Sequence, residues 1–483
     1  PTSRPSPPVD AAHRALLESW VAGVTERPGQ HCGVFTGTDG EPFGHRARPW
    51  DYPDILVAGH LDGAALVLEL ASVAARKPDI DSGIFAYAKY GFGEYWGFAA
   101  AVGFWIGTCV GNVSYWVLIK STLGAFFPVF GDGNTAVAIA VASVGIWLFH
   151  FLILRGVQQA AAINKIVTIA KVIPIMVFIV ILIFAFKIDL FSFNLYGGDL
   201  TNGLFEQVKA TMLVTVFVFI GIEGASVYSG RAQRRSDVGK ATVIGFLGVL
   251  ALLVLVNVLS LGIMSQPELA ELQNPSLAAV LEHIVGPWGA LLISIGLAIS
   301  LLGALLSWAL LCAEILFATA RDKTMPAFLK KENANHVPVN ALWLTNVMIQ
   351  IFLLITLFSA GTYTSLIYLA SSMILVPYLW SAAYAVLLSG RGETYENASA
   401  ERRKDLLIGG IALVYAVWLL YAGGVKYLLL SALLYAPGVI LFAKAKHEQG
   451  QPLFTHIEKG IFAGVVLGAV VAAYGLYDGF LSL

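Results

Sequence analysis

The sequence contains little charge and few cysteines. Only 13% of its 483 residues are Asp, Glu, Lys or Arg, whereas soluble domains carry about 25%. The net charge at pH 7 is −1 and indicates no particular class of partner, so we expect no nucleic acid among the partners. The three cysteines, Cys32, Cys109 and Cys312, are scattered along the chain. They form neither a disulfide framework nor a metal-binding spacing.

The motifs of soluble enzymes are missing as well. The sequence has no Walker loop, no GxGxxG motif after a strand, no HExxH motif and no nucleophile elbow. No ATP-binding domain is fused to the chain. The alternation of apolar and polar residues that marks a membrane β-barrel is also missing, because the apolar runs are continuous. We therefore expect neither an enzyme nor a cofactor, and the fold class that remains is an all-α polytopic membrane protein.

Long apolar runs are what the sequence has in abundance. Hydrophobic residues make up 57% of the chain, and the mean hydropathy is +0.75. A run of about 20 apolar residues is long enough to cross a bilayer as a helix. We predict a transmembrane domain over 61–483 with about 11–12 helices. The predicted spans are 64–75, 95–127, 135–154, 161–186, 207–230, 240–264, 287–320, 339–358, 363–388, 406–422, 426–443 and 457–480.

Lysine and arginine gather at every second connection between these spans. They are concentrated at 231–240, 321–338 and 390–405, whereas PVFGDGN at 128–134 has none and the connection at 265–287 is acidic. Loops rich in lysine and arginine face the cytoplasm in most membrane proteins. The pattern therefore predicts a multi-pass protein whose basic loops are cytoplasmic.

Residues 1–60 differ from the rest of the chain. They are rich in Pro, Arg, His and Gly, and no stretch among them is apolar enough to span a bilayer. They also lack the apolar core and the small-residue cleavage site of a signal peptide. Two interpretations remain open. The segment is either a non-spanning cytoplasmic tail or a product of a shifted reading frame, because GC-rich codons read out of frame give such a mixture.

Glu223 is the most informative residue inside a predicted span. It lies in VFIGIEGASVYSG, between Gly221 and Gly224. An ionisable residue within a span costs about 2.5–3.5 kcal/mol on insertion scales. Non-helical backbone at that depth is tolerated only inside protein or beside a cavity, and broken helices of this kind form the substrate sites of many transporters. The alternative is a carboxylate that is paired with a neighbouring helix for packing alone.

Four further residues carry two interpretations each. Asn112 has an amide that can bind a ligand or join two helices. Trp308 lies in the middle of a span, where it can stack on a cation or pack in the core. Lys171 can act as a fixed or titrating cation, or extend to the cytoplasmic surface. Ser371 precedes Pro377, which kinks a helix and leaves backbone groups without their helical partners. Those groups can contact a ligand, or the kink can be purely structural.

Several segments together resemble the amino acid–polyamine–organocation superfamily. They are WIGTCVGN, FIGIEGAS followed by RAQRRSDVGKAT, LLSWALLCAE, ARDKTMP and SSMILVPYLW. Within that superfamily the chain resembles the basic amino acid/polyamine antiporters from about residue 65 onward. It is most similar to the arginine:ornithine exchangers of the bacterial arginine deiminase pathway, on segments such as ENANHVPVNALWLTN and FSAGTYTSLIYLA. The resemblance implies a LeuT-like fold, an inverted five-plus-five helix repeat with extra C-terminal helices.

The resemblance also implies a role for each candidate residue. Substrate-binding roles fall on Asn112, Phe217, Ile220, Gly221 and Trp308, and on Ser371 as the substitute for a polar contact at Ala370. Gating roles fall on Phe104, Glu223 and Tyr378. Lys171 resembles a lysine that replaces a sodium ion in some relatives, which makes it the candidate for coupling.

The implied function is exchange of extracellular arginine for intracellular ornithine across the bacterial cytoplasmic membrane. The expected partners are these two substrates and the lipid bilayer, and a homodimer is compatible with the resemblance. The family's first helix has a glycine-rich motif that holds the substrate carboxylate, but here Gly33-Val34-Phe35 is only a weak echo of it. Two alternatives follow. The chain exchanges another dibasic pair, or it is transport-inactive because its first helix is absent or degraded.

Overall fold

The computed structural model describes most of the chain beyond residue 83. The described ranges are 84–124, 126–131, 133–156, 172–196, 235–265, 275–357, 363–396 and 398–481, with isolated positions between 66 and 80, at 209, 217 and 220–221, and at 268–269 and 272. The predictions for residues 1–60 and for a degraded first helix lie outside the described residues, as does most of the predicted span 207–230.

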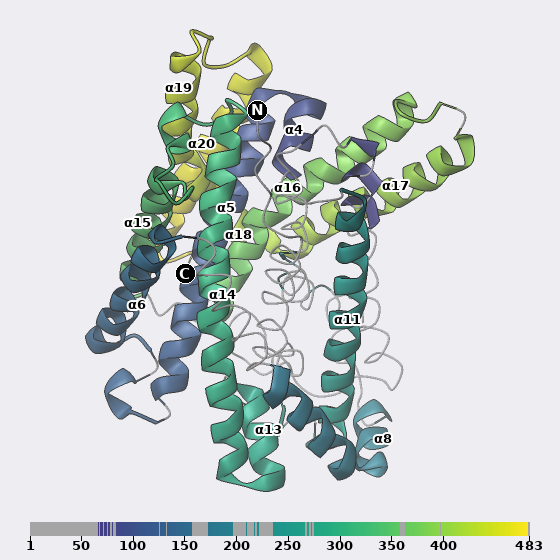
Figure 1. Cartoon of the computed structure of the whole chain (residues 1–483), viewed down its shortest axis with the longest axis vertical. Coiled ribbons are helices and arrows are strands. Elements are labelled where there is room, and N and C mark those ends of the chain that lie inside the picture. The colour runs from purple at the N-terminus through teal and green to yellow at the C-terminus, as the bar shows by residue number, and fades with distance from the viewer. Residues whose placement is uncertain are drawn as a thin grey trace.

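Every regular element in the described ranges is a helix (Figure 1). Eight helical segments in the described ranges, one of them running through α18, η4 and α19, are long and apolar enough to cross a membrane, so the prediction of an all-α membrane protein is confirmed. The helices are α4 (Ile84–Phe92), α5 (Glu94–Gly124), α6 (Ala136–Leu154), α8 (Ile188–Tyr196), α11 (Arg235–Leu261), α13 (Ser276–Val285), α14 (Pro287–Arg321), α15 (Val339–Ile355), α16 (Tyr363–Arg391), α17 (Ser399–Ala422), α18 (Gly424–Tyr435), α19 (Val439–Glu448) and α20 (His456–Tyr477), with short 3-10 turns η1 (Pro128–Phe130), η3 (Ala327–Lys330) and η4 (Ala436–Gly438).

Helix α13 differs from the sequence prediction, which placed an acidic loop between 265 and 287. Its buried residues include Leu277, Val280 and Leu281, and they recur with the spacing of one helical face. Ten residues are too few to cross a bilayer. The helix instead packs on the first turns of α14, where Gly289 meets the side chain of Leu281. A search for long apolar runs misses such a short, one-sided helix.

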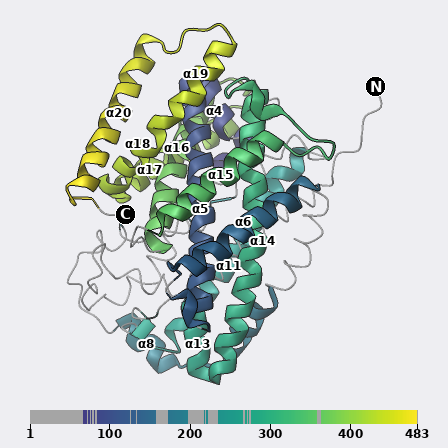
Figure 2. The ribbon, with the colours of Figure 1, turned by 90° about the vertical axis from the view of Figure 1, so that its left-hand side faces the viewer.

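Helix α14 connects two hydrophobic cores. It has 35 residues, which corresponds to about 52 Å at 1.5 Å per residue. Ile293 packs in a core with α11, α13 and the helical residues 172–185, whereas Leu297 and later residues pack in a larger core with α5, α15 and α16. Figures 1 and 2 show α14 running along most of the length of the molecule, with α13 at one end. Side chains near the middle of α14 therefore lie where the two cores meet.

Helices α5 and α16 approach each other unusually closely. Gly103 and Gly107 are four residues apart and so lie on one face of α5. A Cβ atom on Gly107 would lie 2.7 Å from Cγ1 of Ile374 and 3.1 Å from the carbonyl oxygen of Ala370. One on Gly103 would lie 3.0 Å from the carbonyl oxygen of Met373 on α16, and it would also meet the hydroxyl oxygen of Tyr435 on α18. Small residues at this spacing let the backbones of membrane helices approach closely, so α5 and α16 are held together by van der Waals packing.

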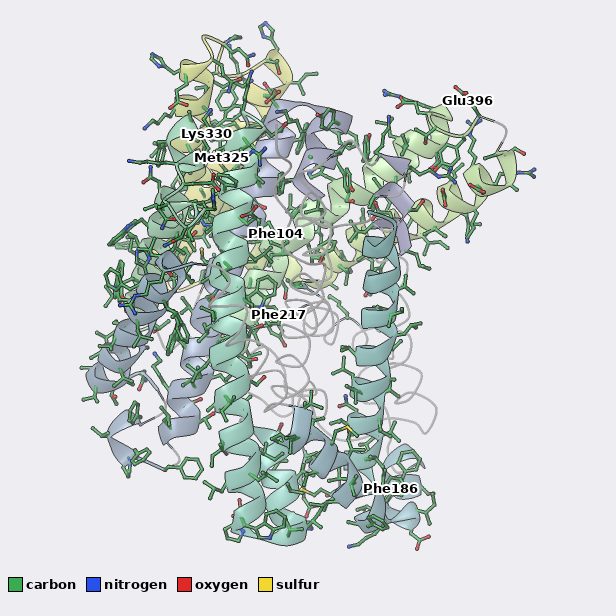
Figure 3. The ribbon with its side chains drawn as sticks, viewed as in Figure 1. Phe104, Phe186, Phe217, Met325, Lys330 and Glu396 are labelled. Carbon is green, nitrogen blue, oxygen red and sulfur yellow. The ribbon has the colours of Figure 1, made fainter. Side chains whose placement is uncertain are left out.

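Ion pairs join the helix ends that carry the basic loops. The Lys89 ammonium donates to the carboxylate of Asp322 at 2.8 Å, to its carbonyl oxygen at 2.7 Å and to the Thr324 hydroxyl at 3.1 Å. These bonds attach α4 to the C-terminal end of α14. In Figure 3, Lys330 and Glu396 lie at one end of the molecule and Phe186 at the other. This arrangement fits the predicted cytoplasmic side.

We predict that replacing Gly107 by Ala destabilises the protein. The added methyl group would meet Ile374 and the Ala370 carbonyl, and overpacking of this kind typically costs about 1–3 kcal/mol. Gly410→Ala on α17 is the matched control, because open space surrounds that position and alanine favours a helix by up to about 1 kcal/mol. Thermal unfolding of the purified protein in detergent, followed by tryptophan fluorescence, should show a lower Tm for Gly107→Ala alone. Equal Tm values for the two variants would contradict the prediction.

The topology predicts which side of the membrane each loop faces. Ala334 lies in a predicted cytoplasmic loop and Asn134 in a predicted outer loop, and both residues are exposed. In intact cells a membrane-impermeant maleimide should label Asn134→Cys but not Ala334→Cys. The unsubstituted chain gives the background, since Cys109 and Cys312 are buried and only Cys32 lies outside the described residues. The opposite labelling pattern would invert the topology.

Candidate functional site

The amide of Asn112 is held in one orientation by its neighbours on α5 and α14. Its Nδ2 atom donates to the carbonyl oxygen of Thr108 at 2.9 Å and lies 3.9 Å from Sγ of Cys312. The Cys312 thiol in turn donates to the Thr108 hydroxyl at 3.0 Å. The side chain of Asn112 is buried. Because Nδ2 is directed at these two partners, Oδ1 is the atom with which Asn112 can accept a hydrogen bond from a ligand.

Thr108 completes this polar contact within α5. Its hydroxyl donates to the carbonyl oxygens of Phe104 and Trp105, at 2.8 and 2.9 Å. The sequence analysis assigned no role to Thr108 or Cys312, although their spacing contained a signal. Thr108 precedes Asn112 by four residues, and Cys312 follows Trp308 by four, so each shares a helical face with a candidate.

Trp308 is buried on α14, one turn before Cys312. The link from Cys312 to Asn112 therefore brings Trp308 to within about one helical turn of the Asn112 amide. The indole Nε1 of Trp308 has no hydrogen-bond partner among the described residues. Most buried polar atoms are hydrogen-bonded, so this N–H group is available to donate to a bound molecule.

Phe217 faces α5 near Gly111, and the chain turns three residues after it. The Phe217 ring meets Tyr115 edge-on, with ring centroids 6.4 Å apart, and it lies 3.8 Å from the Cβ position of Gly111. The chain turns at Ile220 and Gly221, where Gly221 has a φ of +117°, a conformation that favours glycine. A turn at this depth agrees with the predicted break. Figure 3 places Phe104 and Phe217 beside the middle of α14.

The remaining candidates divide into two groups. Ser371 and Tyr378 are buried on α16, seven residues apart and so on similar faces of that helix. Ser371 follows Ala370, whose carbonyl oxygen faces Gly107 on α5. Glu223 and Lys171 lie outside the described residues. The structure thus brings together Asn112, Trp308, Phe217 and the turn at 220–221, with Ser371 one helix away.

Glu69 and Lys120 are further ionisable residues buried in the described helices, as are His150 and Lys446, and the sequence analysis singled out neither of the first two as a site. Glu69 accepts a hydrogen bond from the Ser381 hydroxyl at 3.0 Å, which joins its helical segment to α16. Lys120 is buried near the end of α5, and its ammonium has no hydrogen-bond partner among the described residues. The sequence signal for both was a single charged residue in an apolar run, Glu69 in LVLELA and Lys120 in VLIKST. In the described part of the chain, no group of three or more His, Cys, Asp or Glu could hold a metal ion.

The sequence profile of the amino acid permease family matches residues 55–439. The chain belongs to this family. It is 64% identical to an arginine/ornithine antiporter of Pseudomonas aeruginosa over 426 residues, which covers 86% of this chain and 88% of the relative. It is also 41% identical to an L-lysine transport protein of Corynebacterium glutamicum over 89% of this chain and 90% of the relative. An arginine/agmatine antiporter of Chlamydia felis is 38% identical over 83% and 84% of the two chains.

A solved structure gives the fold of this permease independently. The transporter MhsT, crystallised with L-phenylalanine, superposes with a TM-score of 0.61 over 87% of this chain and 100% of MhsT, at 14% sequence identity. The predicted LeuT-like fold is therefore confirmed. Family, fold and helices together make the permease a multi-pass transporter of the bacterial inner membrane, and the prediction that it is no enzyme is confirmed.

Proposed function

We propose that this permease exchanges extracellular arginine for intracellular ornithine. The observation that carries the proposal is the amide of Asn112, whose nitrogen is occupied by Thr108 and Cys312 and whose oxygen remains as an acceptor. The Pseudomonas aeruginosa relative supports it, because 64% of its aligned residues are identical and its name states this exchange. The other two relatives are named for substrates that also carry a cationic end.

The site suits a cation that donates several hydrogen bonds. A guanidinium carries five N–H donors and no acceptor, so it complements the oxygen of Asn112 rather than the nitrogen. Its flat face can stack on the buried indole of Trp308, which is a stronger contact when both groups are out of water. Ornithine ends in a shorter ammonium that donates to the same oxygen. The same acceptor and ring therefore serve both substrates, as an exchanger requires.

The α-amino acid end of the substrate is assigned to the turn at Ile220 and Gly221. Helix breaks in transporters leave backbone carbonyl groups unbonded, and these coordinate cationic groups. We assign the substrate's α-ammonium to this backbone, Phe217 and Tyr378 to closure of the site, Glu223 to gating and Lys171 to coupling. Ser371 contributes a hydroxyl from α16. A homodimer stays a prediction.

A second candidate function is exchange of a different dibasic pair. The Corynebacterium glutamicum relative is named for L-lysine and the Chlamydia felis relative for agmatine. An oxygen acceptor and an indole ring accept a lysine ammonium or an agmatine guanidinium with the same contacts. The two functions separate by competition, because a tenfold excess of unlabelled external lysine or agmatine would abolish arginine uptake only if that compound were a substrate or a ligand of equal affinity.

We predict that Asn112→Ala and Trp308→Ala each weaken the binding of arginine. Loss of the amide acceptor should cost about 1–3 kcal/mol, and loss of a desolvated cation–π contact about 2 kcal/mol. Trp308→Phe should recover part of the loss, since a smaller aromatic face remains. Asn346→Ala is the matched control, because this buried amide bonds His150 on α6, away from the site. The affinity of each variant for arginine is measured by scintillation proximity. Equal affinities in all four variants would show that Asn112 and Trp308 only pack in the core.

The exchange itself is tested in vesicles loaded with ornithine and given labelled arginine outside. Uptake that requires internal ornithine is expected. The chain is assayed as it stands and with residues 1–64 replaced by the matching N-terminal part of the Pseudomonas aeruginosa relative. Uptake by the hybrid alone would support the transport-inactive alternative for the present N-terminal segment. Absence of uptake in both, with normal membrane insertion, would contradict the proposed exchange.

A further inference from the structure

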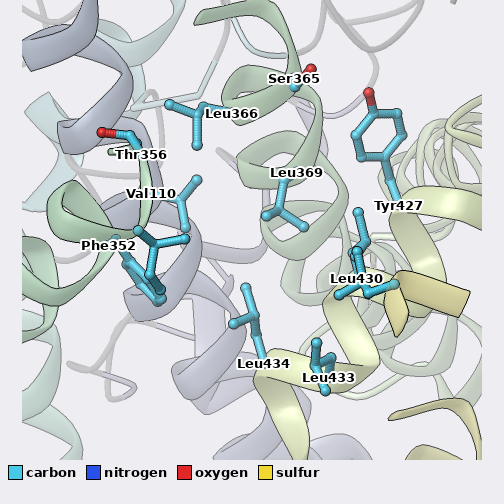
Figure 4. A pocket seen from close by; sticks show the side chains of 12 residues that line it. Val110, Phe352, Thr356, Ser365, Leu366, Leu369, Tyr427, Leu430, Leu433 and Leu434 are labelled. Atoms are coloured by element: carbon cyan, nitrogen blue, oxygen red, sulfur yellow. The ribbon is translucent and has the colours of Figure 1, made fainter. Parts of the chain in front are cut away.

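An apolar pocket of about 280 Å³ lies between α5, α15, α16, α18 and α20, away from the residues of the candidate site (Figure 4). Its walls are mostly leucine, with Leu369 from α16, Leu430 and Leu434 from α18, and Val110 from α5. Water does not fill an apolar cavity stably, because each water molecule needs two to four polar partners. A hydrocarbon group is therefore the ligand that suits the pocket.

One end of the pocket is polar. Thr356, Ser365 and Tyr427 line this end, opposite Leu433 and Leu434 (Figure 4). The ammonium of Lys426 lies 5.4 Å from the centroid of the Tyr427 ring. A positive charge and hydroxyl groups thus lie at one end of an otherwise apolar space.

The connectivity of the chain places this polar end on the predicted outer side of the membrane. α15 starts after the basic loop at 321–338 and ends at Ile355, just before Thr356. α16 starts at Tyr363, two residues before Ser365. α18 starts at Gly424, two residues before Lys426 and three before Tyr427. The deeper leucines then lie towards the middle of the bilayer. The pocket has the polarity of one lipid leaflet, with a headgroup end and a hydrocarbon end.

The pocket also adjoins the surface that faces lipid. α20 contributes Leu476 to the wall, and only 17% of its spanning window is buried. Exposed apolar side chains such as Leu467 and Val470 cover the rest of that helix. A bilayer protein exposes such a face to acyl chains, so hydrocarbon is present next to the pocket at all times.

We propose that this pocket binds a phospholipid of the outer leaflet. One acyl chain fills the space among Val110, Leu369 and Leu434, and the phosphate is held at the Lys426 end. A phosphate accepts charge-assisted hydrogen bonds from an ammonium and from hydroxyl groups, which matches Lys426, Tyr427 and Ser365 in sign and in donor character. The proposal rests on the membrane topology and does not depend on which amino acids the permease exchanges.

The bound chain would support the wall of the candidate site. Val110 lies two residues before Asn112, and Leu369 precedes Ala370, whose carbonyl oxygen meets Gly107. A filled pocket therefore adds a contact between α5 and α16 about one helical turn from Gly107. We expect the exchange rate to be higher in vesicles that contain an anionic phospholipid, such as phosphatidylglycerol, than in vesicles of a neutral lipid without phosphate.

The binding is tested with two pairs of variants of the full chain. Leu434→Trp fills the pocket, and Leu467→Trp adds the same side chain on the exposed face of α20. Lys426→Gln removes the charge at the entrance, and Lys444→Gln removes another lysine that lies over an aromatic ring, 4.4 Å from the Phe328 centroid at the cytoplasmic end. Native mass spectrometry of detergent-purified protein, titrated with phosphatidylglycerol, reports the bound phospholipid. Leu434→Trp should lose it, and Lys426→Gln should bind it roughly tenfold more weakly, whereas both controls should behave as the unsubstituted chain.

Three outcomes would overturn the proposal. Unchanged phosphatidylglycerol binding by Leu434→Trp would show that the lipid sits elsewhere. Equal weakening by Lys426→Gln and Lys444→Gln would remove the headgroup assignment. A change from dimer to monomer in Leu434→Trp, with lipid binding unchanged, would show that a second copy of the chain occupies the pocket. Leu434→Phe, a smaller filling, and the Tm of each variant separate loss of the lipid from loss of the fold.

Discussion

The contact of α5 with α16 at Gly103 and Gly107 is the constraint on which the rest of the structure depends. It brings α16 so close to α5 that a Cβ atom at Gly107 would lie 2.7 Å from Cγ1 of Ile374 and 3.1 Å from the Ala370 carbonyl oxygen. The spanning window of α5 is 94% buried. A helix buried in this way, inside a bilayer, has no water to satisfy its polar side chains. Polar side chains on α5 therefore depend on partners within the protein. Thr108 and Asn112 are bonded to backbone carbonyls and to Cys312, whereas the Lys120 ammonium has no hydrogen-bond partner among the described residues.

The second consequence concerns where recognition can take place. α14 crosses both hydrophobic cores, and its cytoplasmic end is held by Lys89 through Asp322 and Thr324. Trp308 and Cys312 are thereby fixed relative to Asn112, and the amide can offer only its oxygen to a ligand. Because Nδ2 of Asn112 already has two partners, the amide can accept a hydrogen bond from a donor group on a ligand but cannot donate one to an acceptor group. The proposed binding of a cation relies on this acceptor and on the aromatic face of Trp308, and Glu223 is the candidate for a full negative charge.

Much of this could be predicted from the sequence, and the failures have a common cause. Continuous apolar runs predicted α5, α6, α14, α16 and α20 with ends within a few residues, because hydrocarbon length is set by the bilayer. The break near Gly221 was predicted from glycines beside a carboxylate. Thr108 and Cys312 were missed because their partners lie on another helix, and cysteines were considered only for disulfides and metals. α13 was missed because its single apolar face depends on packing against α14, which no local pattern reveals.

The glycine contact and the apolar pocket involve the same pair of helices, because Val110 follows Gly107 by three residues on α5. They differ in what they tolerate. At Gly107 an added methyl group would meet the side chain of Ile374 and the carbonyl oxygen of Ala370. The pocket arises where α15 ends at Ile355 and α18 begins at Gly424, so that helix ends rather than helix faces meet beside Leu369. A space of this kind can hold a flexible hydrocarbon chain of varying length. The proposed lipid would therefore make this part of the interface depend on the composition of the membrane, whereas the glycine contact depends on the protein alone.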